Sequence, residues 1–271
     1  MTAADVNRGP AASPRAPAIE IERLRVAYGP LVALEETSLT VGACEFVSLL
    51  GPSGCGKTTL LKAVAGLVRP TSGEIRVMGG SVEEARRQRA FGLVFQDPTL
   101  LPWRRAEANA QLLAEIIGGR HWDPGRVDEL LRAVGLKGFE RAYPAALSGG
   151  MKQRVAIVRA LAFDPQVLLM DEPFAALDAL TRERLGEVLL DVWRQSKPVI
   201  FVTHSIEEAV FLSDRVVVMT ARPGRVLDEV RIELGRPRTH AMKESHEFFQ
   251  ATRRLRGLID IAQGVAVQEG G

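Results

Sequence analysis

Cysteine, long apolar runs and an excess of either charge are scarce in this sequence of 271 residues, and each shortage excludes a class of protein. It has two cysteines, Cys44 and Cys55, and no histidine cluster accompanies them. Two cysteines at this spacing form neither a zinc site nor a disulfide framework. No apolar run approaches the roughly 20 residues that cross a bilayer as a helix. The 35 basic and 33 acidic residues leave a net charge of +2, which disfavours a nucleic-acid-binding surface. These limits favour one large globular domain, or a domain with an inserted lobe.

The two ends of the chain differ in composition from the rest. Residues 1–17 are rich in Ala and Pro, with scattered charges and no apolar stretch of the signal-peptide type. We therefore expect a disordered tail on a cytoplasmic protein. We also expect a flexible C-terminus over residues 263–271.

The segment from Gly51 to Thr58 has the pattern G-x-x-x-x-G-K-[ST], which is a phosphate-binding loop. It follows the apolar run 46–50 and precedes the helical pattern 59–65, which is the strand–loop–helix order that the motif requires. Glycines let backbone N–H groups turn onto phosphate oxygens, and the helix N-terminus adds its partial positive charge. The motif predicts that Lys57 reaches the β- and γ-phosphates and that the Thr58 hydroxyl binds Mg²⁺. A plain glycine-rich turn would not explain why Lys and Thr follow in this order.

Apolar periodicity predicts strands that alternate with helices around a central helical region. Strands are expected at 19–26, 46–50, 74–78, 91–95, 167–170, 199–202 and 216–219, with a strand pair or an edge strand at 225–234. Helices are expected at 180–194, 206–212 and 244–261, and also at 106–117, 126–134 and 150–163. The last three suggest a helical lobe inserted into an α/β domain. The unbroken apolar strands and their alternation with helices predict a parallel sheet covered on both faces.

Polar residues follow three of the expected strands, at the end where α/β sheets bind ligands. Asp171 and Glu172 follow one strand, His204 a second and Gln96 a third. Asp171 is placed to hold Mg²⁺, directly or through water, and Glu172 to polarise a water in line with the γ-phosphate. Each residue alone is weak evidence, but a phosphate loop upstream raises its value.

A second anion site is predicted where residues 147–153 open a helix, because Ser148 and two glycines leave N–H groups exposed. Taken alone, Ser148 would be an ordinary N-cap. Asp178 stands six residues after Glu172, in the segment Ala-Ala-Leu-Asp.

Taken together, these motifs resemble those of the ATP-binding subunits of ABC transporters. The phosphate loop, Gln96, residues 147–153, residues 167–172, Asp178 and His204 occur in that family's order and approximate spacing. The resemblance covers about residues 18–262, expected to form the ABC ATPase domain. It implies an α/β P-loop NTPase (RecA-like) fold. In that fold a parallel-sheet core carries an N-terminal antiparallel β-subdomain and an inserted α-helical subdomain, here residues 97–164.

The resemblance also implies roles for single residues. Tyr28 would stack on the adenine, Glu172 would be the general base, and His204 would contact the γ-phosphate. Gln96 would touch Mg²⁺ and sense the partner, and Asp178 would bridge a dimer. The expected catalytic residues are Glu172, His204, Lys57 and Gln96, and the expected Mg²⁺ ligands are Thr58, Gln96 and Asp171. The expected ATP-binding residues are Tyr28, Gly51, Pro52, Ser53, Gly54, Cys55, Gly56, Lys57, Thr58, Thr59, Ser148, Gly149, Gly150 and Asp178, where residues 148–150 grip a γ-phosphate held by a second subunit.

Residues 96–104, 171–181 and 221–225 resemble the nitrate, sulfonate and taurine importers within this family. This resemblance implies an ATP-bound homodimer with two composite sites, peripheral to the cytoplasmic face of the inner or plasma membrane. Its partners would be two transmembrane permease subunits and, indirectly, a solute-binding protein, with no nucleic acid.

Other functions stay open on the sequence alone. They are the ABC ATPase of another transport system, a soluble ABC ATPase of translation or DNA repair, a phosphate-loop kinase, and a nucleotide-binding scaffold without turnover. Translation-type members usually carry two cassettes in one chain, and repair-type members carry a long coiled-coil insertion. A kinase would not need the Ser-Gly-Gly helix or Asp178, and the presence of Glu172 and His204 disfavours a scaffold. The sequence does not identify the transported solute.

Overall fold

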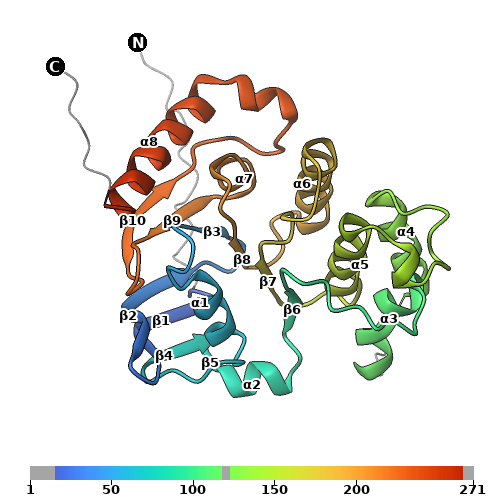
Figure 1. Cartoon of the computed structure of the whole chain (residues 1–271), viewed down its shortest axis with the longest axis horizontal. Helices are drawn as coiled ribbons and strands as arrows, with labels where there is room; N and C mark the ends of the chain where they lie inside the picture. Colours follow the sequence, from blue (N-terminus) through green and yellow to red (C-terminus); the bar gives the residue numbers. More distant parts are fainter. Residues whose placement is uncertain (1–15, 118–122, 265–271) are drawn as a thin grey trace, which may run out of the picture.

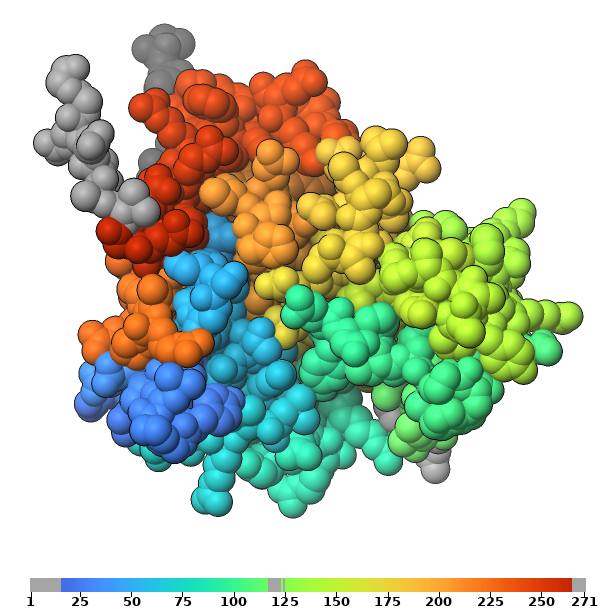
Figure 2. Space-filling model, in the orientation of Figure 1, coloured from blue at the N-terminus to red at the C-terminus, as the bar shows by residue number. Residues whose placement is uncertain are grey.

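The computed structural model of this chain describes residues 16–117 and 123–264. Two sheets lie side by side, and a helical lobe projects from them to one side (Figure 1). Figure 2 shows the same lobe, in green, on the right-hand side of the molecule. Most of the expected N-terminal tail (1–15) and of the expected flexible C-terminus (265–271) lies outside the described residues.

The larger sheet has six strands in the order β10-β9-β3-β8-β7-β6. Its strands are β3 (Phe46–Leu50), β6 (Phe91–Val94), β7 (Val167–Asp171), β8 (Val199–Val202), β9 (Arg215–Met219) and β10 (Val226–Arg231). Strands β3, β6, β7, β8 and β9 are parallel, and the edge strand β10 pairs antiparallel with β9. The expected parallel sheet is therefore confirmed. Because these strands are parallel, the residues that follow β3, β6, β7, β8 and β9 meet at the carboxyl end of the strands, which is called the sheet edge below.

Both faces of this sheet are covered, as the apolar runs predict. Phe46 and Leu50 of β3 pack into one core cluster, whereas Val47 and Leu49 pack into the other. The first cluster includes apolar residues of α6 (Ala179–Trp193), α7 (Ile206–Leu212) and α8 (His246–Ala262). The second includes the helix α1 (Lys57–Val64), which lies between the two sheets. Each fully buried large apolar side chain contributes roughly 1.5–3 kcal/mol.

The smaller sheet is antiparallel, in the order β2-β1-β4-β5. It consists of β1 (Ile19–Tyr28), β2 (Leu31–Val41), β4 (Ser72–Val77) and β5 (Gly80–Ser81), followed by α2 (Val82–Arg87). The sequence patterns did not predict β2 or α2. The pairing of β1 with β2 shifts register at bulges, and Arg23 and Glu36 both have a φ of 44° there. A bulge breaks the alternation of period two, and this explains why β2 escaped notice.

The helical lobe contains α3 (Ala106–Ile117), α4 (Pro124–Ala133), the short η1 (Pro144–Ala146) and α5 (Gly149–Ala162). These helices lie between β6 and β7 in the chain, as the periodicity predicts. Their apolar residues continue the core cluster of α6 and α7. The fold class, an α/β P-loop NTPase with an inserted helical lobe, is therefore confirmed, while the boundaries 18–262 and 97–164 stay predictions. A last short helix, η2 (His240–Glu244), precedes α8. None of the described helices has the length and apolar character that a bilayer crossing requires.

Candidate functional site

The phosphate loop joins β3 to α1 and lies against β2. Gly56 has a φ of +99°, and a side chain there would come within 2.6 Å of an atom of β2. Only glycine therefore allows this close approach. Lys57 crosses the loop, and its Nζ donates to the carbonyl oxygens of Gly51 at 2.8 Å and Pro52 at 3.0 Å. This buried ammonium could donate to the phosphate oxygens of a polyphosphate in place of these carbonyl oxygens.

The end of β7 brings Asp171 next to the loop. The Thr58 hydroxyl donates to Asp171 Oδ1 at 2.9 Å. Burial raises the pKa of the Asp171 carboxyl, and the hydrogen bond from Thr58 opposes that rise. A buried carboxylate of this kind gains from a nearby cation, which compensates its charge.

Glu172 and His204 meet at the ends of two adjacent strands. Glu172 follows β7 with a φ of 44°, and its N–H donates to Val202 O of β8 at 3.0 Å. Its Oε2 lies 3.3 Å from His204 Nδ1, and the His204 side chain is 63% exposed. A left-handed backbone is uncommon at a non-glycine residue. Glu172 and His204 therefore form a carboxylate–imidazole pair at the ends of β7 and β8, and the imidazole is exposed to solvent.

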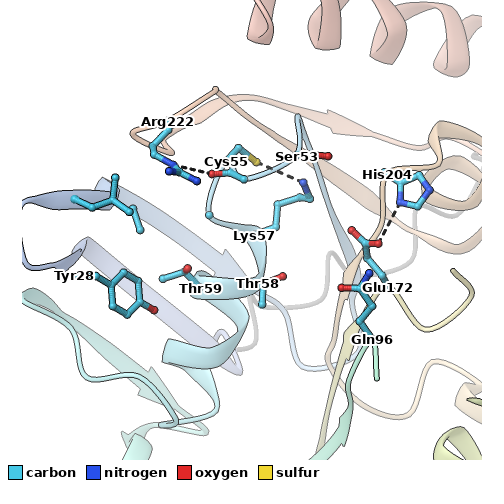
Figure 3. A pocket seen from close by; sticks show the side chains of 14 residues that line it. Tyr28, Ser53, Cys55, Lys57, Thr58, Thr59, Gln96, Glu172, His204 and Arg222 are labelled. Carbon is cyan, nitrogen blue, oxygen red and sulfur yellow. Dashed lines mark hydrogen bonds and ion pairs between the residues drawn. The ribbon is translucent and has the colours of Figure 1, made fainter. Parts of the chain in front are cut away.

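These side chains surround a cavity of about 590 Å³ (Figure 3). Figure 3 shows Tyr28, the last residue of β1, at one end and Glu172, His204 and Gln96 at the other, with the phosphate loop between them. The cavity is lined by Tyr28, Leu31, Ala33, Ser53, Gly54, Cys55, Gly56, Lys57, Thr58, Thr59, Gln96, Glu172, His204 and Arg222. Eleven of these 14 are expected site residues, so the fold brings together segments from the whole chain.

Three expected residues belong to the same region without lining the cavity. Gly51 and Pro52 begin the loop and accept hydrogen bonds from Lys57, and Asp171 lies beside Thr58.

The other four expected residues lie elsewhere: Ser148, Gly149, Gly150 and Asp178 do not line this cavity. The Ser148 side chain caps α5 by accepting from Met151 N at 3.2 Å, and Asp178 caps α6 by accepting from Thr181 N at 2.9 Å. A Cβ at Gly149 would meet no atom within 4 Å. Within the described residues of one chain, the predicted second anion site is therefore an open helix end that does not line the cavity.

The helical lobe is nevertheless bonded to the cavity's edge. Gln153 of α5 is buried, and its Nε2 donates to Phe95 O at 3.0 Å. Phe95 directly precedes Gln96, which lines the cavity. This contact joins the N-terminal part of α5 to the residue that precedes Gln96.

Arg222 lines the cavity, but the motif reasoning missed it as a site residue. It lies in the turn after β9, where Thr220 N donates to Arg225 O at 2.9 Å. The turn is pressed onto the site: Gly224 N donates to Ala33 O at 3.0 Å, and a Cβ at Gly224 would lie 1.9 Å from the Cys55 carbonyl oxygen. One signal could have revealed it, because β9 ends at the same sheet edge as β3, β7 and β8.

The Arg222 guanidinium is held by one bond, from Nε to Gly54 O at 3.2 Å. No carboxylate pairs with it in the described part of the chain. In Figure 3 it lies nearer to the Tyr28 end than His204 does. Its other nitrogen atoms are therefore available to a ligand at that end of the cavity.

The site's oxygen atoms suit a hard cation that arrives with a ligand. No group of three or more His, Cys, Asp or Glu residues is arranged to hold a metal among the described residues. The Thr58 hydroxyl and the Asp171 carboxylate are oxygen ligands of the type that Mg²⁺ takes, usually with substrate phosphates and water completing its shell. The residues present therefore fit Mg²⁺ bound together with a polyphosphate.

Comparisons with known proteins agree with this geometry. A family model described as ABC transporter matches residues 34–175. The uncharacterised ABC transporter ATP-binding protein MJ0412 of Methanocaldococcus jannaschii is 50% identical over 218 residues, which cover 80% of this chain and 81% of the relative. The aliphatic sulfonates import ATP-binding protein SsuB of Bacillus cereus is 44% identical over 227 residues, 83% of this chain and 87% of the relative. A dimeric structure of the ATP-binding cassette MJ0796, bound to ADP and Pi, superposes with a TM-score of 0.71 at 31% identity, covering 80% of this chain and 100% of that one.

Proposed function

This chain belongs to the ABC transporter family, and from that premise we propose that it is the ATP-hydrolysing subunit of a solute importer. It binds ATP, and its hydrolysis of ATP is coupled to transport. One observation carries the proposed mechanism. The cavity contains a phosphate loop and a carboxylate–histidine pair, whereas the Ser-Gly-Gly helix end lies outside it.

The missing donors come from a second copy of the chain. In this arrangement two copies pair head to tail, so that residues 148–150 of each close the nucleotide cavity of the other. Asp178, at the start of α6, lies at the contact between the copies. The dimeric cassette bound to ADP and Pi supports this pairing, because this chain matches all of that structure.

Hydrolysis then uses groups that the sheet edge already holds. Glu172 accepts a proton from a water whose oxygen attacks the γ-phosphorus, and the bond from that phosphorus to the bridging oxygen breaks, giving ADP and phosphate. His204 Nδ1 faces Glu172, which leaves Nε2 available to the γ-phosphate. Lys57 and the loop N–H groups hold the β- and γ-phosphates. Thr58, Asp171 and Gln96 are the residues that would hold Mg²⁺, which would supply positive charge to neutralise the phosphates.

The two ends of the cavity have different tasks. Tyr28 is 48% exposed and offers a ring face on which adenine stacks. Arg222, on the same side, contacts the nucleotide with the nitrogen atoms that Gly54 leaves free.

The Arg222→Gln variant should bind ATP about five- to tenfold more weakly, a loss of about 1–1.4 kcal/mol, because a charge-assisted contact is removed. Titration of the purified chain with ATP measures this. Arg231→Gln is the matched control, since Arg231 is exposed on β10 and does not line the cavity. Equal ATP affinities for both variants would remove Arg222 from the site.

The subunit works at the cytoplasmic face of the membrane with two permease subunits and a solute-binding protein. The closing and opening of the ATP-bound dimer drives the permease between its two open forms. The resemblance of residues 96–104 and 171–181 to the nitrate, sulfonate and taurine importers, together with the SsuB relative, supports a small solute of the nitrate, sulfonate or taurine type.

This function is tested by co-purifying the chain with its permease and placing the complex in vesicles. With ATP on the side of this subunit, addition of the binding protein and candidate anions to the other side should raise ATP hydrolysis and carry solute to the ATP side. The importer assignment would be contradicted if ATP were hydrolysed but none of the tested solutes moved, or if solute moved away from the ATP side. Transfer of phosphate to a small molecule instead of water would indicate a kinase.

A further inference from the structure

A largely buried carboxylate on α7 has no role in the mechanism above. Glu208 lies one turn after His204, and its side chain is 13% exposed. Its Oε2 accepts from the Thr203 hydroxyl at 2.5 Å, and its Oε1 lies 3.3 Å from Arg182 Nε. Burial raises the pKa of Glu208, while Thr203 and Arg182 oppose that rise. The charge is therefore costly to bury, and the hydrogen bond from Thr203 and the ion pair with Arg182 compensate that cost.

Each of these two contacts leads to a different loop of the proposed site. Thr203 directly precedes His204, and its hydroxyl also accepts from Ser205 N at 3.0 Å. The Thr203 side chain thus fixes the backbone on both sides of His204. A movement of Glu208 would therefore change the position of His204 and, with it, the contact between His204 and Glu172.

The ion pair with Arg182 leads to the segment that carries Asp178. Arg182 of α6 donates from Nη2 to Leu177 O at 3.1 Å, and Leu177 directly precedes Asp178. Arg182 thus joins the backbone beside Asp178 to the carboxylate beside His204. In the described part of the chain, Glu208 Oε1 has no ionic partner other than Arg182.

From these contacts we infer that Glu208 is a positioning residue, which, with Arg182, couples the loop of Asp178 to the orientation of His204 toward Glu172. The inference rests on the proposed function, in which Asp178 meets a second copy and His204 meets the γ-phosphate. Docking of the partner at Asp178 shifts or steadies Leu177. Arg182 transmits this to Glu208, and Thr203 transmits it to His204. Hydrolysis is thereby favoured when the dimer is closed, whereas binding of ATP to one copy does not depend on this network.

The test compares variants of the full-length chain. Glu208→Gln keeps the size of the side chain and an oxygen that accepts from Thr203, but loses the charge that Arg182 meets. We expect the kcat for ATP to fall about tenfold, while the Kd for ATP of a single copy stays within about twofold. Arg182→Gln should give the same result. The double variant should be no worse than either single variant, because both break one coupling.

Glu183, next to Arg182 on α6, provides a matched control. Glu183 of α6 also forms an ion pair, with Lys243 at 2.8 Å, and it lies 2.6 Å from His240 Nε2, but among the described residues it contacts neither loop. Glu183→Gln should therefore change kcat by less than about twofold. A melting curve of each variant separates the expected kcat loss from unfolding.

Three results would overturn the inference. They are a kcat within twofold of wild type for Glu208→Gln, an equal loss of ATP affinity and kcat, and losses that multiply in the double variant. Wild type and Glu172→Gln are measured in parallel. A wild-type chain that does not hydrolyse ATP would overturn the proposed function, whereas normal wild-type turnover with an unaffected Glu208→Gln would overturn only the coupling.

Discussion

Glu172→Gln should hydrolyse ATP about 10²- to 10⁴-fold more slowly than the wild type while still binding it. An amide keeps the size of the side chain, but it cannot accept the proton of the attacking water. The nucleotide contacts at Lys57 and Tyr28 are untouched, so ATP affinity should change little. Because hydrolysis is what releases the link between the copies, ATP-bound dimers should accumulate. Steady-state phosphate release, ATP titration and size-exclusion chromatography with ATP measure these three effects.

The control for this prediction is Glu207→Gln. Glu207 is exposed on α7, three residues after His204, and does not line the cavity. It should hydrolyse ATP at the wild-type rate. Near-normal turnover in Glu172→Gln would remove Glu172 from the role of base. A Glu172→Gln chain that stays monomeric with ATP would argue against the nucleotide as the link between copies.

The position of Glu172 was predictable because it depends on local patterns. The apolar run of β7 had to be a buried parallel strand, and a residue just after such a strand lies at the ligand-binding edge. The same reasoning placed Gln96 and His204 at the edge. The phosphate loop was equally local, since strand, glycines and helix are contiguous in the chain.

Other features depend on contacts between distant segments, and the sequence patterns did not reveal them. Arg222 reaches the cavity because its turn packs against the phosphate loop, 168 residues away from Gly54. The Arg182–Glu208 pair depends on how α6 and α7 pack, which no periodicity encodes. The strand β2 was missed because its bulge interrupts the alternation. Local chemistry was therefore readable, whereas side-chain partners across the fold were not.

The open helix end at Gly149 leads to the second large effect. Gly149→Asp should reduce ATP hydrolysis by at least about 100-fold while leaving ATP binding to one copy unchanged. A Cβ at Gly149 meets nothing within 4 Å, and an acidic residue in the first turn of α5 suits the helix dipole, so the fold should tolerate the change. In a closed dimer, however, the new carboxylate would face the partner's γ-phosphate, where like charges repel and the N–H donors are blocked. ATP titration of the monomer and phosphate release by the wild type and the variant measure the two effects.

Gly257→Asp is the matched control, because Gly257 lies in α8 and a Cβ there also meets nothing within 4 Å. It should bind and hydrolyse ATP as the wild type does. Mixing sharpens the test. In the proposed dimer a Gly149→Asp copy spoils the site of its partner, and a Lys57→Ala copy spoils its own. A mixture of the two should therefore recover hydrolysis in mixed dimers, which retain one intact composite site. If Gly149→Asp weakens monomer binding as much as hydrolysis, or if the mixture recovers nothing, residues 148–150 act within their own chain and the head-to-tail pairing is wrong.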